Sequence, residues 1–258
     1  MAGLKNKIVF VTGASSGIGR ASAEAFAKKG SNLILCARRS DRLKEIRSAL
    51  IKKYKVKVLV IELDVRKLQH VKKAVASLPQ YWKNIDVLLN NAGLARGLNK
   101  FYEADTDHWD EMIDTNVKGL VYVTRYVLPL MVERKRGHII NIGSTAGHEI
   151  YPMGNVYCAT KFAVKALSQS IRVDVLDKNI KVTSVDPGMV LTEFAKVRFS
   201  WDEVRAKKVY DGVVPLSPKD VAEAIIFAAT RPANVNINEI ILTPIIQASS
   251  NHIFRKSN

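Results

Sequence analysis

Cysteine is scarce in this sequence, and long apolar runs are missing. Only two of the 258 residues are cysteine, Cys36 and Cys158, and we interpret them as small buried side chains rather than a disulfide or metal pair. No stretch approaches the ~20 apolar residues that cross a bilayer, and the first residues lack the apolar segment of a signal peptide. We therefore expect a soluble, cytoplasmic protein with no membrane span.

Metal-ligand spacings, linkers and repeats are missing as well. The five histidines form no His-x-x-x-His or Cys/His pattern, so we predict no metal site. Ser144 lacks the Gly-x-Ser-x-Gly elbow of α/β-hydrolases, which argues against nucleophilic catalysis. Without Pro/Gly/Ser linkers, low-complexity segments or repeats, residues 1–258 are expected to form a single domain.

Positive charge is abundant instead. The 40 Lys and Arg residues exceed the 24 Asp and Glu residues and leave a net charge of +16. Such a charge suits nucleic acid, an anionic membrane surface or an anionic small molecule. The basic residues are scattered and not interleaved with aromatic residues, so we expect no specific nucleic-acid partner. A nucleic-acid-binding or ligand-sensing module that does no catalysis stays open as an alternative.

Apolar runs typical of strands alternate with amphipathic helical patterns along the whole chain. The expected strands are 7–12, 32–36, 57–63, 87–90, 137–142, 181–185 and 240–242, and the expected helices are 19–28, 42–53, 71–78, 108–130, 157–176 and 219–229. This alternation predicts an α/β fold, a doubly wound parallel sheet of the Rossmann type. Residues 189–218 interrupt it with a short helical pattern at 196–210, and a loop of this length predicts a substrate lid.

A glycine-rich turn lies between the first expected strand and the first helix. Gly13 allows a tight turn, Gly17 lets the backbone approach a pyrophosphate, and Gly19 lets the helix pack closely on the strand. Ser15, Ser16 and Ile18 complete the turn, whose amides would face anionic phosphates at the start of the helix. The strand before and the helix after this turn predict a dinucleotide-binding site.

Several motifs together resemble one family. The turn is similar to the Thr-Gly-x-x-x-Gly-Ile-Gly signature of short-chain dehydrogenases, and Asn-Asn-Ala-Gly at 90–93 and Pro-Gly at 187–188 follow at the intervals typical of that family. Asn116, Ser144, Tyr157 and Lys161 match its catalytic tetrad, and the match spans nearly the whole chain. The resemblance implies an oxidoreductase that uses a nicotinamide cofactor.

The end of the second expected strand indicates which nicotinamide is used. An NAD site usually has an acid there that binds the ribose 2′-hydroxyl, whereas a 2′-phosphate requires a cation. Here Arg38 and Arg39 follow the strand, and the first acid is Asp41. A guanidinium can bind a phosphate through two hydrogen bonds, so we predict NADP(H), although both arginines could also be solvated loop charges.

The resemblance implies further cofactor contacts along the chain. In the family, the position of Asp64, with Val65 beside it, contacts the adenine, and the position of Thr192 and the backbone at Val190 hold the nicotinamide carboxamide. Asn90, Ala92, Gly93, Pro187 and Gly188 are the remaining cofactor positions that it implies. For Asn90 and Asn91, satisfaction of backbone groups at the strand end is the alternative.

The predicted catalytic residues suit proton transfer during carbonyl reduction. Tyr157 can exchange a proton with the substrate oxygen, and Lys161, four residues later on the same helix face, favours its phenolate. Ser144, at a strand end, could hold the substrate oxygen. In the family, a residue at the position of Asn116 orders a water chain to the lysine.

Two short motifs bear on the substrate. Val-Arg-Phe at 197–199 and the segment 232–238 look like the branch that oxidises serine and other small 3-hydroxy acids. Arg198 would bind the carboxylate, unless it pairs with acids of the lid itself, Glu193, Asp202 or Glu203. A competing interpretation is a carbonyl reductase for apolar or lipid-like substrates, whose site would be lined by Met153, Phe194, Phe199 and Trp201.

The two long expected helices are apolar on more than one face. They carry Val121, Val123, Val127, Ala163, Leu167 and Ile171 in addition to their other apolar residues. More apolar surface than one sheet can cover indicates a partner, so we expect a homo-oligomer. In the family these helices pack against another subunit, commonly in tetramers, so a tetramer is favoured over a dimer.

Overall fold

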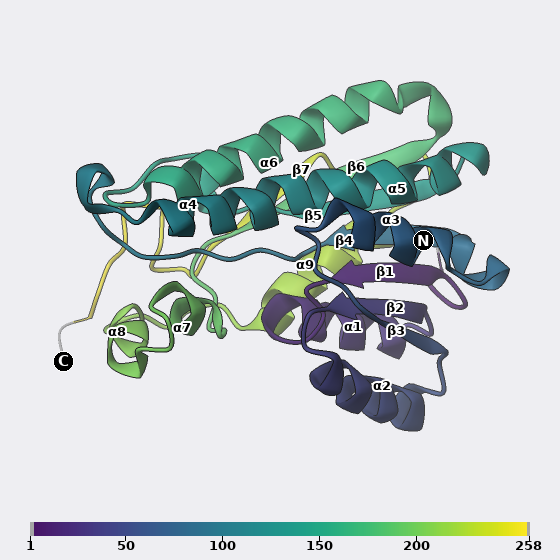
Figure 1. The fold of residues 1–258 in the computed structure, drawn as a ribbon, viewed down its shortest axis with the longest axis horizontal. Coiled ribbons are helices and arrows are strands. Elements are labelled where there is room, and N and C mark those ends of the chain that lie inside the picture. The colour runs from purple at the N-terminus through teal and green to yellow at the C-terminus, as the bar shows by residue number, and fades with distance from the viewer. Residues whose placement is uncertain (1–2, 257–258) are drawn as a thin grey trace.

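The computed structural model describes residues 3–256 and contains one sheet of seven parallel strands (Figure 1). The strands are β1 (Ile8–Thr12), β2 (Asn32–Ala37), β3 (Val58–Glu62), β4 (Ile85–Asn90), β5 (Gly137–Ile142), β6 (Ile180–Pro187) and β7 (Glu239–Leu242). Their order is β3-β2-β1-β4-β5-β6-β7, so the winding direction reverses between β1 and β4. In such a sheet, ligands bind beyond the carboxyl ends of the strands at this reversal.

Helices cover both faces of the sheet, as the nearly continuous apolar strands require. One face carries α1 (Gly17–Lys28), α2 (Ser40–Tyr54) and α9 (Pro218–Ala229) (Figure 1). The other carries α3 (Leu68–Ala76), α4 (Thr106–Ile113), α5 (Gly119–Glu133) and α6 (Asn155–Asp174). Two apolar clusters fill these layers, around Phe26 on the first face and Val127 on the second. The predicted doubly wound fold in a single domain is confirmed, and both cysteines are free and buried.

The helix expected at 108–130 is interrupted. A π-helical turn, Asp114–Lys118, separates α4 from α5 and buries Asn116. Gly119 follows this turn, and a Cβ atom there would lie 2.7 Å from the Val65 side chain. The widened turn therefore lies next to the packing contact between Gly119 and the loop after β3. The helical periodicity of the sequence does not indicate this contact.

The segment 189–218 contains two short helices, α7 (Phe194–Arg198) and α8 (Glu203–Lys208), instead of one helix at 196–210. Ser200 and Trp201, with φ of 52° and 70°, turn the chain between them. Asp202 then caps α8 by accepting a hydrogen bond from the Arg205 amide at 3.0 Å. Both helices lie beyond the carboxyl ends of the strands (Figure 1), where a lid over the site would lie.

No helix within residues 3–256 combines the length and the apolar character that a membrane span needs.

Candidate active site

The glycine-rich turn has the backbone conformation that its sequence predicts. Gly13 and Gly17 have φ of +63° and +52°, and a Cβ atom at Gly17 would lie 3.2 Å from the Thr192 side chain. The Asn91 amide donates hydrogen bonds of 2.9 and 3.1 Å to the carbonyl oxygens of Thr12 and Gly13. Asn91 therefore braces the turn through backbone carbonyl groups, in agreement with the satisfaction of backbone groups at the strand end that is the alternative stated for it above.

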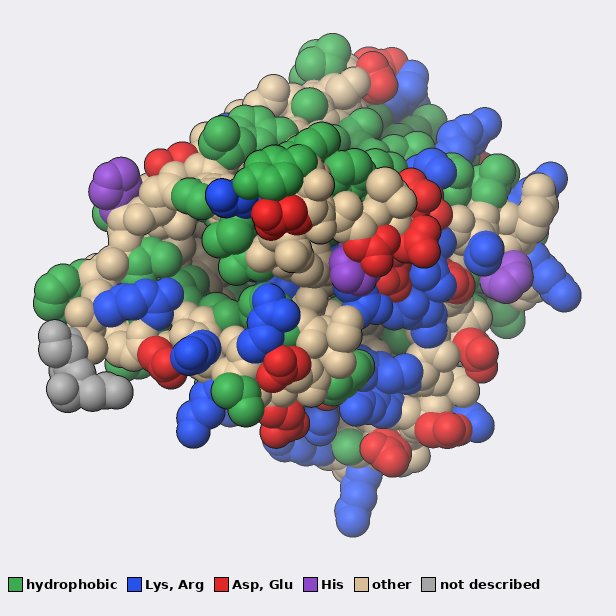
Figure 2. Space-filling model, turned by 60° about the vertical axis from the view of Figure 1, so that its left-hand side comes forward, with side chains coloured by type: hydrophobic (Ala, Val, Ile, Leu, Met, Phe, Trp, Pro, Cys, Tyr) green, Lys and Arg blue, Asp and Glu red, His purple; other side chains and the backbone are tan. Residues whose placement is uncertain are grey.

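An open cavity of about 370 Å³ extends over the carboxyl edge of the sheet. The predicted residues on its wall are Gly13, Ser15, Ser16, Gly17, Ile18, Arg38, Arg39, Asp64, Val65, Ala92, Gly93, Ser144, Tyr157, Lys161, Pro187, Gly188, Val190 and Thr192. Lys and Arg side chains gather on the face shown in Figure 2, with fewer carboxylates among them. The glycine-rich turn on the cavity wall and the guanidinium groups at the end of β2 fit a dinucleotide that carries a 2′-phosphate.

Four predicted residues lie off the cavity wall. Gly19 packs beneath the turn, where a Cβ atom would overlap the Gly13 carbonyl. The buried Asn90 amide donates hydrogen bonds of 2.9 Å to the side chains of Thr124 and Asn141, so these bonds do not go to the backbone groups expected at the strand end. The other two, Asn116 and Arg198, are not among the residues that line the cavity, and their contacts are described below.

A lid carboxylate reaches the predicted 2′-phosphate site. Glu193 forms ion pairs of 2.9 Å with Arg39 and 2.7 Å with Arg42, while Arg39 also donates a 2.9 Å hydrogen bond to the Ser16 hydroxyl. Burial acts to raise the pKa of Glu193, but the two guanidinium groups lower it overall. Arg42 was not among the predicted residues, although its place on α2, three residues after Arg39, is a local signal.

A second group of ion pairs lies at the end of the cavity where Asp64 is predicted to contact the adenine. Arg66 binds Asp64 at 2.7 Å, and Glu111 accepts a 2.6 Å contact from Arg96 and lies 3.8 Å from Arg38. Arg96 also donates a 2.7 Å hydrogen bond to the Val197 carbonyl in α7. The lid is therefore linked to both arginine-rich walls of the cavity.

The predicted catalytic residues converge from three elements. Tyr157 and Lys161 lie on α6, Ser144 follows β5, and Asn116 comes from the π-helical turn. The Lys161 ammonium donates a 2.9 Å hydrogen bond to the Ile142 carbonyl and lies 5.9 Å from the centre of the Tyr157 ring.

Asn116 acts on the loop between β4 and α4. Its side chain exchanges two 2.8 Å hydrogen bonds with the backbone of Leu94. A Cβ atom at Gly93 would lie 3.3 Å from the Asn116 oxygen and 3.8 Å from the Lys161 nitrogen. The Asn116 and Lys161 side chains thus both lie next to Gly93, without a direct hydrogen bond between them among the described contacts.

Burial changes the proton affinities of the catalytic pair in opposite directions. It raises the pKa of Tyr157, while Arg198 and Ser144 act against this change. It lowers the pKa of Lys161 to about 8, against the effect of Asp186. In this structure Tyr157 is therefore a protonated phenol, and a neighbouring positive charge is needed for it to accept a proton.

Arg198 lies against Tyr157, the predicted catalytic tyrosine. Its guanidinium carbon is 5.1 Å from the centre of the Tyr157 ring, and it donates a 2.7 Å hydrogen bond to the Tyr151 hydroxyl. Within residues 3–256 the buried Arg198 Nε has no hydrogen-bond partner.

The acids of the lid are engaged elsewhere. Glu193 pairs with Arg39 and Arg42, Glu203 pairs with Lys196 at 2.7 Å, and Asp202 caps α8. The alternative in which Arg198 pairs within the lid has no support among the ion pairs described, so its guanidinium stays available to a ligand.

A family model described as short chain dehydrogenase matches residues 7–203, and the chain belongs to this family. The NADP-dependent 3-hydroxy acid dehydrogenase of Salmonella typhi is 47% identical over 242 residues, which cover 93% of this chain and 96% of the relative. The NADP-dependent 3-hydroxy acid dehydrogenase of Schizosaccharomyces pombe is 44% identical over 257 residues, which cover 99% of this chain and 99% of the relative. The closed form of a serine dehydrogenase complexed with NADP+ superimposes with a TM-score of 0.90 at 45% identity, covering 97% of this chain and 100% of the other. The resemblance stated from the motifs is confirmed.

Proposed function

We propose that the protein is an oxidoreductase that transfers a hydride between NADP(H) and a small 3-hydroxy acid, such as serine or 3-hydroxyisobutyrate. The observation that carries this proposal is the Arg198 guanidinium, which lies beside Tyr157 with a donor left unsatisfied. A buried donor without a partner is unfavourable, so the site favours a ligand that carries a carboxylate. The names of the relatives in Salmonella typhi and Schizosaccharomyces pombe support the same substrate class.

The cofactor part of the proposal depends on the turn and on the arginine residues. When bound, NADP(H) supplies or accepts the hydride at its nicotinamide ring. The amides after Gly13 and Gly17 would bind its diphosphate, and Arg38 and Arg39 its 2′-phosphate. Thr192, which lies on the cavity wall next to Gly17, is the candidate for the carboxamide.

The residues of the chain then divide the proton chemistry among them. Tyr157 donates its proton to the substrate oxygen during reduction and removes it during oxidation. The Ser144 hydroxyl holds that oxygen beside Tyr157, and the Lys161 charge stabilises the phenolate. Asn116 positions the loop at Gly93, next to the Lys161 ammonium, through its hydrogen bonds to Leu94. Arg198 orients the substrate through its carboxylate.

An absorbance assay of NADPH tests this function. Wild type and Tyr157→Phe are compared with serine, 3-hydroxypropionate, 3-hydroxyisobutyrate and a panel of ketones and aldehydes. We expect wild type to reduce NADP with the hydroxy acids, and the variant to lose activity by at least about a hundredfold while still binding NADPH. Tight NADPH binding without turnover of any substrate would contradict the proposal and favour the sensing module.

A carbonyl reductase is the second candidate, because Phe194 packs edge-on against Tyr157 with ring centres 5.6 Å apart. Trp201 also lines the cavity, whereas Phe199 is buried in the small core of the lid and Met153 is half-exposed, so these two do not extend an apolar wall. Turnover confined to apolar carbonyls in the same panel would favour this candidate.

We also propose a cytoplasmic homo-oligomer, with a tetramer favoured over a dimer. Val121 on α5 and Phe162 on α6 expose apolar side chains, which supports a partner for these helices. Val123 and Val127, which the sequence analysis counted with this surface, are instead buried in the core against the sheet. The apolar surface is thus smaller than expected. The cytoplasmic location and the number of subunits are predictions from the sequence and the family.

A further inference from the structure

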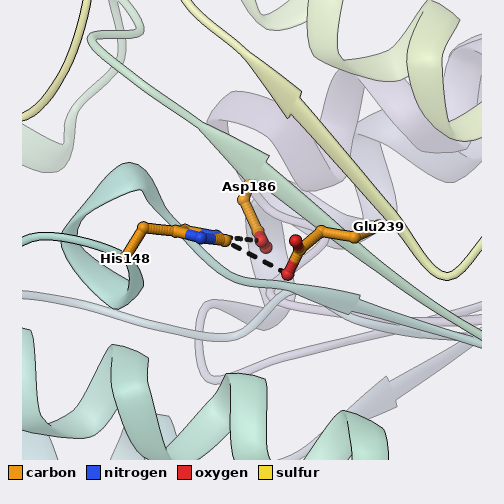
Figure 3. A group of neighbouring side chains, drawn as sticks. All are labelled: His148, Asp186 and Glu239. Carbon is orange, nitrogen blue, oxygen red and sulfur yellow. Dashed lines mark hydrogen bonds and ion pairs between the residues drawn. The ribbon is translucent and has the colours of Figure 1, made fainter.

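A cluster of charged side chains lies behind the catalytic residues, outside the cavity. Figure 3 shows His148, from the turn after β5, pointing at Asp186 in β6 and Glu239 in β7. His148 Nε2 lies 2.7 Å from Asp186 Oδ2 and 3.6 Å from Glu239 Oε1. Lys165 lies one helical turn after Lys161 on α6, and its ammonium is 2.9 Å from His148 Nδ1. Lys165 therefore connects the cluster to α6, one helical turn from the catalytic lysine, Lys161.

The contacts define the hydrogen-bonding state of His148. A lysine ammonium can only donate, so His148 Nδ1 is an acceptor, and a carboxylate can only accept, so Nε2 carries the proton. A metal ion on Nε2 would have to displace this proton and would lie near the positive charge of Lys165. Because Nδ1 already accepts a hydrogen bond and carries no proton, the imidazole ring would then be left without any proton. The three residues in Figure 3 thus suit a hydrogen-bonded chain better than a metal site.

Asp186 is the buried end of this chain. Its carboxylate is 1% exposed and accepts hydrogen bonds from Ser184 and from His148. A Cβ atom at Gly143 would overlap Asp186 Oδ1, so the carboxylate lies directly against the residue that precedes Ser144. Lys161 donates to the carbonyl of Ile142, the residue before Gly143. Asp186 and Lys161 therefore contact the same short segment at the end of β5.

Few other charged or titratable groups face Lys161 and Asp186 among the described residues. Among the described residues, Lys161 faces Tyr157 on its own helix and Asp186 on β6, and Asp186 faces His148 and Glu239 as well. Burial lowers the pKa of Lys161 to about 8, and the Asp186 carboxylate acts in the opposite direction. Burial raises the pKa of Asp186, while hydrogen bonds from Ser184 and His148 counteract this and favour its ionised form.

We propose that Asp186, held ionised by His148 and Ser184, is a positioning residue that keeps the catalytic Lys161 protonated from behind the active site. The charge of Lys161 is what makes the Tyr157 phenolate accessible, so Asp186 extends the pH range of catalysis toward alkaline pH. The inference rests on the catalytic role of Tyr157 and Lys161 proposed above.

A titration of Lys161 tests this without turnover. Nuclear magnetic resonance of the side-chain nitrogen in lysine-labelled enzyme follows its protonation in wild type, Asp186→Asn and Ser184→Ala, with Lys161→Met used only for assignment. We expect the midpoint to fall by about one pH unit in Asp186→Asn, because an opposite charge is lost nearby. Ser184→Ala removes one hydrogen bond from this carboxylate but keeps the carboxylate itself and its bond from His148. Its midpoint should therefore fall much less than that of Asp186→Asn.

Asp186→Ser is a second neutral variant with a smaller side chain, for the case that the asparagine of Asp186→Asn disturbs folding. Thermal unfolding and NADPH binding show whether each variant is folded. The alkaline limb of kcat/KM should move with the Lys161 midpoint. An unchanged midpoint in the neutral variants, or an equal shift in Ser184→Ala, overturns the inference. Since the titration needs no substrate, an enzyme inactive on hydroxy acids would overturn the proposed function and still leave this test decisive.

Discussion

Arg198 combines two effects at one position. Its guanidinium lies 5.1 Å from the centre of the Tyr157 ring, where it acts against the rise in the tyrosine pKa, and it keeps an unsatisfied buried donor. A carboxylate would satisfy that donor, whereas a neutral alcohol would leave it buried and unpaired. The same residue can therefore select the substrate and favour the phenolate.

Replacing Arg198 by leucine should raise KM for serine and other 3-hydroxy acids by about ten- to a hundredfold, the range of a charge-assisted hydrogen bond. Turnover of neutral ketones should fall much less. Lys196→Met is the matched control, since Lys196 is on the same helix and pairs with the exposed Glu203. Steady-state kinetics with both substrate classes measure the effect, and an equal loss for both classes would argue against carboxylate recognition.

Helix α7 is connected to the cofactor cavity at its start. Glu193 precedes the helix and pairs with Arg39 and Arg42, across 154 and 151 residues of sequence. Phe194 and Arg198, within the helix, contact the Tyr157 ring. If Arg39 binds the 2′-phosphate as proposed, the phosphate would compete with the Glu193 carboxylate for it, and we expect cofactor binding and the position of α7 to be linked.

Glu193→Gln should therefore bind NADPH more tightly, by about threefold, because partly exposed ion pairs of this kind contribute less than about 1 kcal/mol. Binding of NADH, which has no 2′-phosphate, should stay unchanged. Glu203→Gln, on the same lid but paired with Lys196, serves as the control. Fluorescence titration of both cofactors measures this, and weaker NADPH binding in Glu193→Gln would sink the competition model.

For the molecule as a whole, one buried histidine connects stability to pH. His138 in β5 is 4% exposed and bonds to Thr183 through Nε2 at 2.7 Å. Burial lowers its pKa to about 3, so the folded protein holds it neutral in a pH range where the unfolded chain, with a histidine pKa near ~6.5, takes up a proton.

The free energy of unfolding should consequently fall as pH drops from about 6.5 toward 3, with up to about 1.4 kcal/mol per pH unit from this residue. The sign follows because the unfolded state binds more protons throughout this window. In His138→Gln that part of the slope should disappear, whereas His70→Gln, at an exposed position of α3, should keep it. Denaturant unfolding at several pH values provides the measurement, and equal slopes in all three proteins would contradict the assignment.

Local patterns in the sequence were sufficient for the fold and for much of the candidate site. The strand and helix periodicities predicted the doubly wound sheet, because burial on both faces imposes them residue by residue. Gly13 and Gly17 signal a turn that few other residues could adopt, and Tyr157 and Lys161 are neighbours because a helix brings residues four apart together. The sequence alone therefore determined the architecture and the candidate proton-transfer pair.

Only the tertiary structure decided the contacts between distant segments. Asp186 and His148 are 38 residues apart, and Glu193 meets Arg39 across 154 residues, so no spacing in the sequence indicates either pair. The packing of Gly119 on Val65, next to the π-helical turn at Asn116, likewise joins segments that are distant in the sequence. Electrostatic and packing contacts of this kind depend on how neighbouring elements are placed, and that placement exists only once the sheet has assembled.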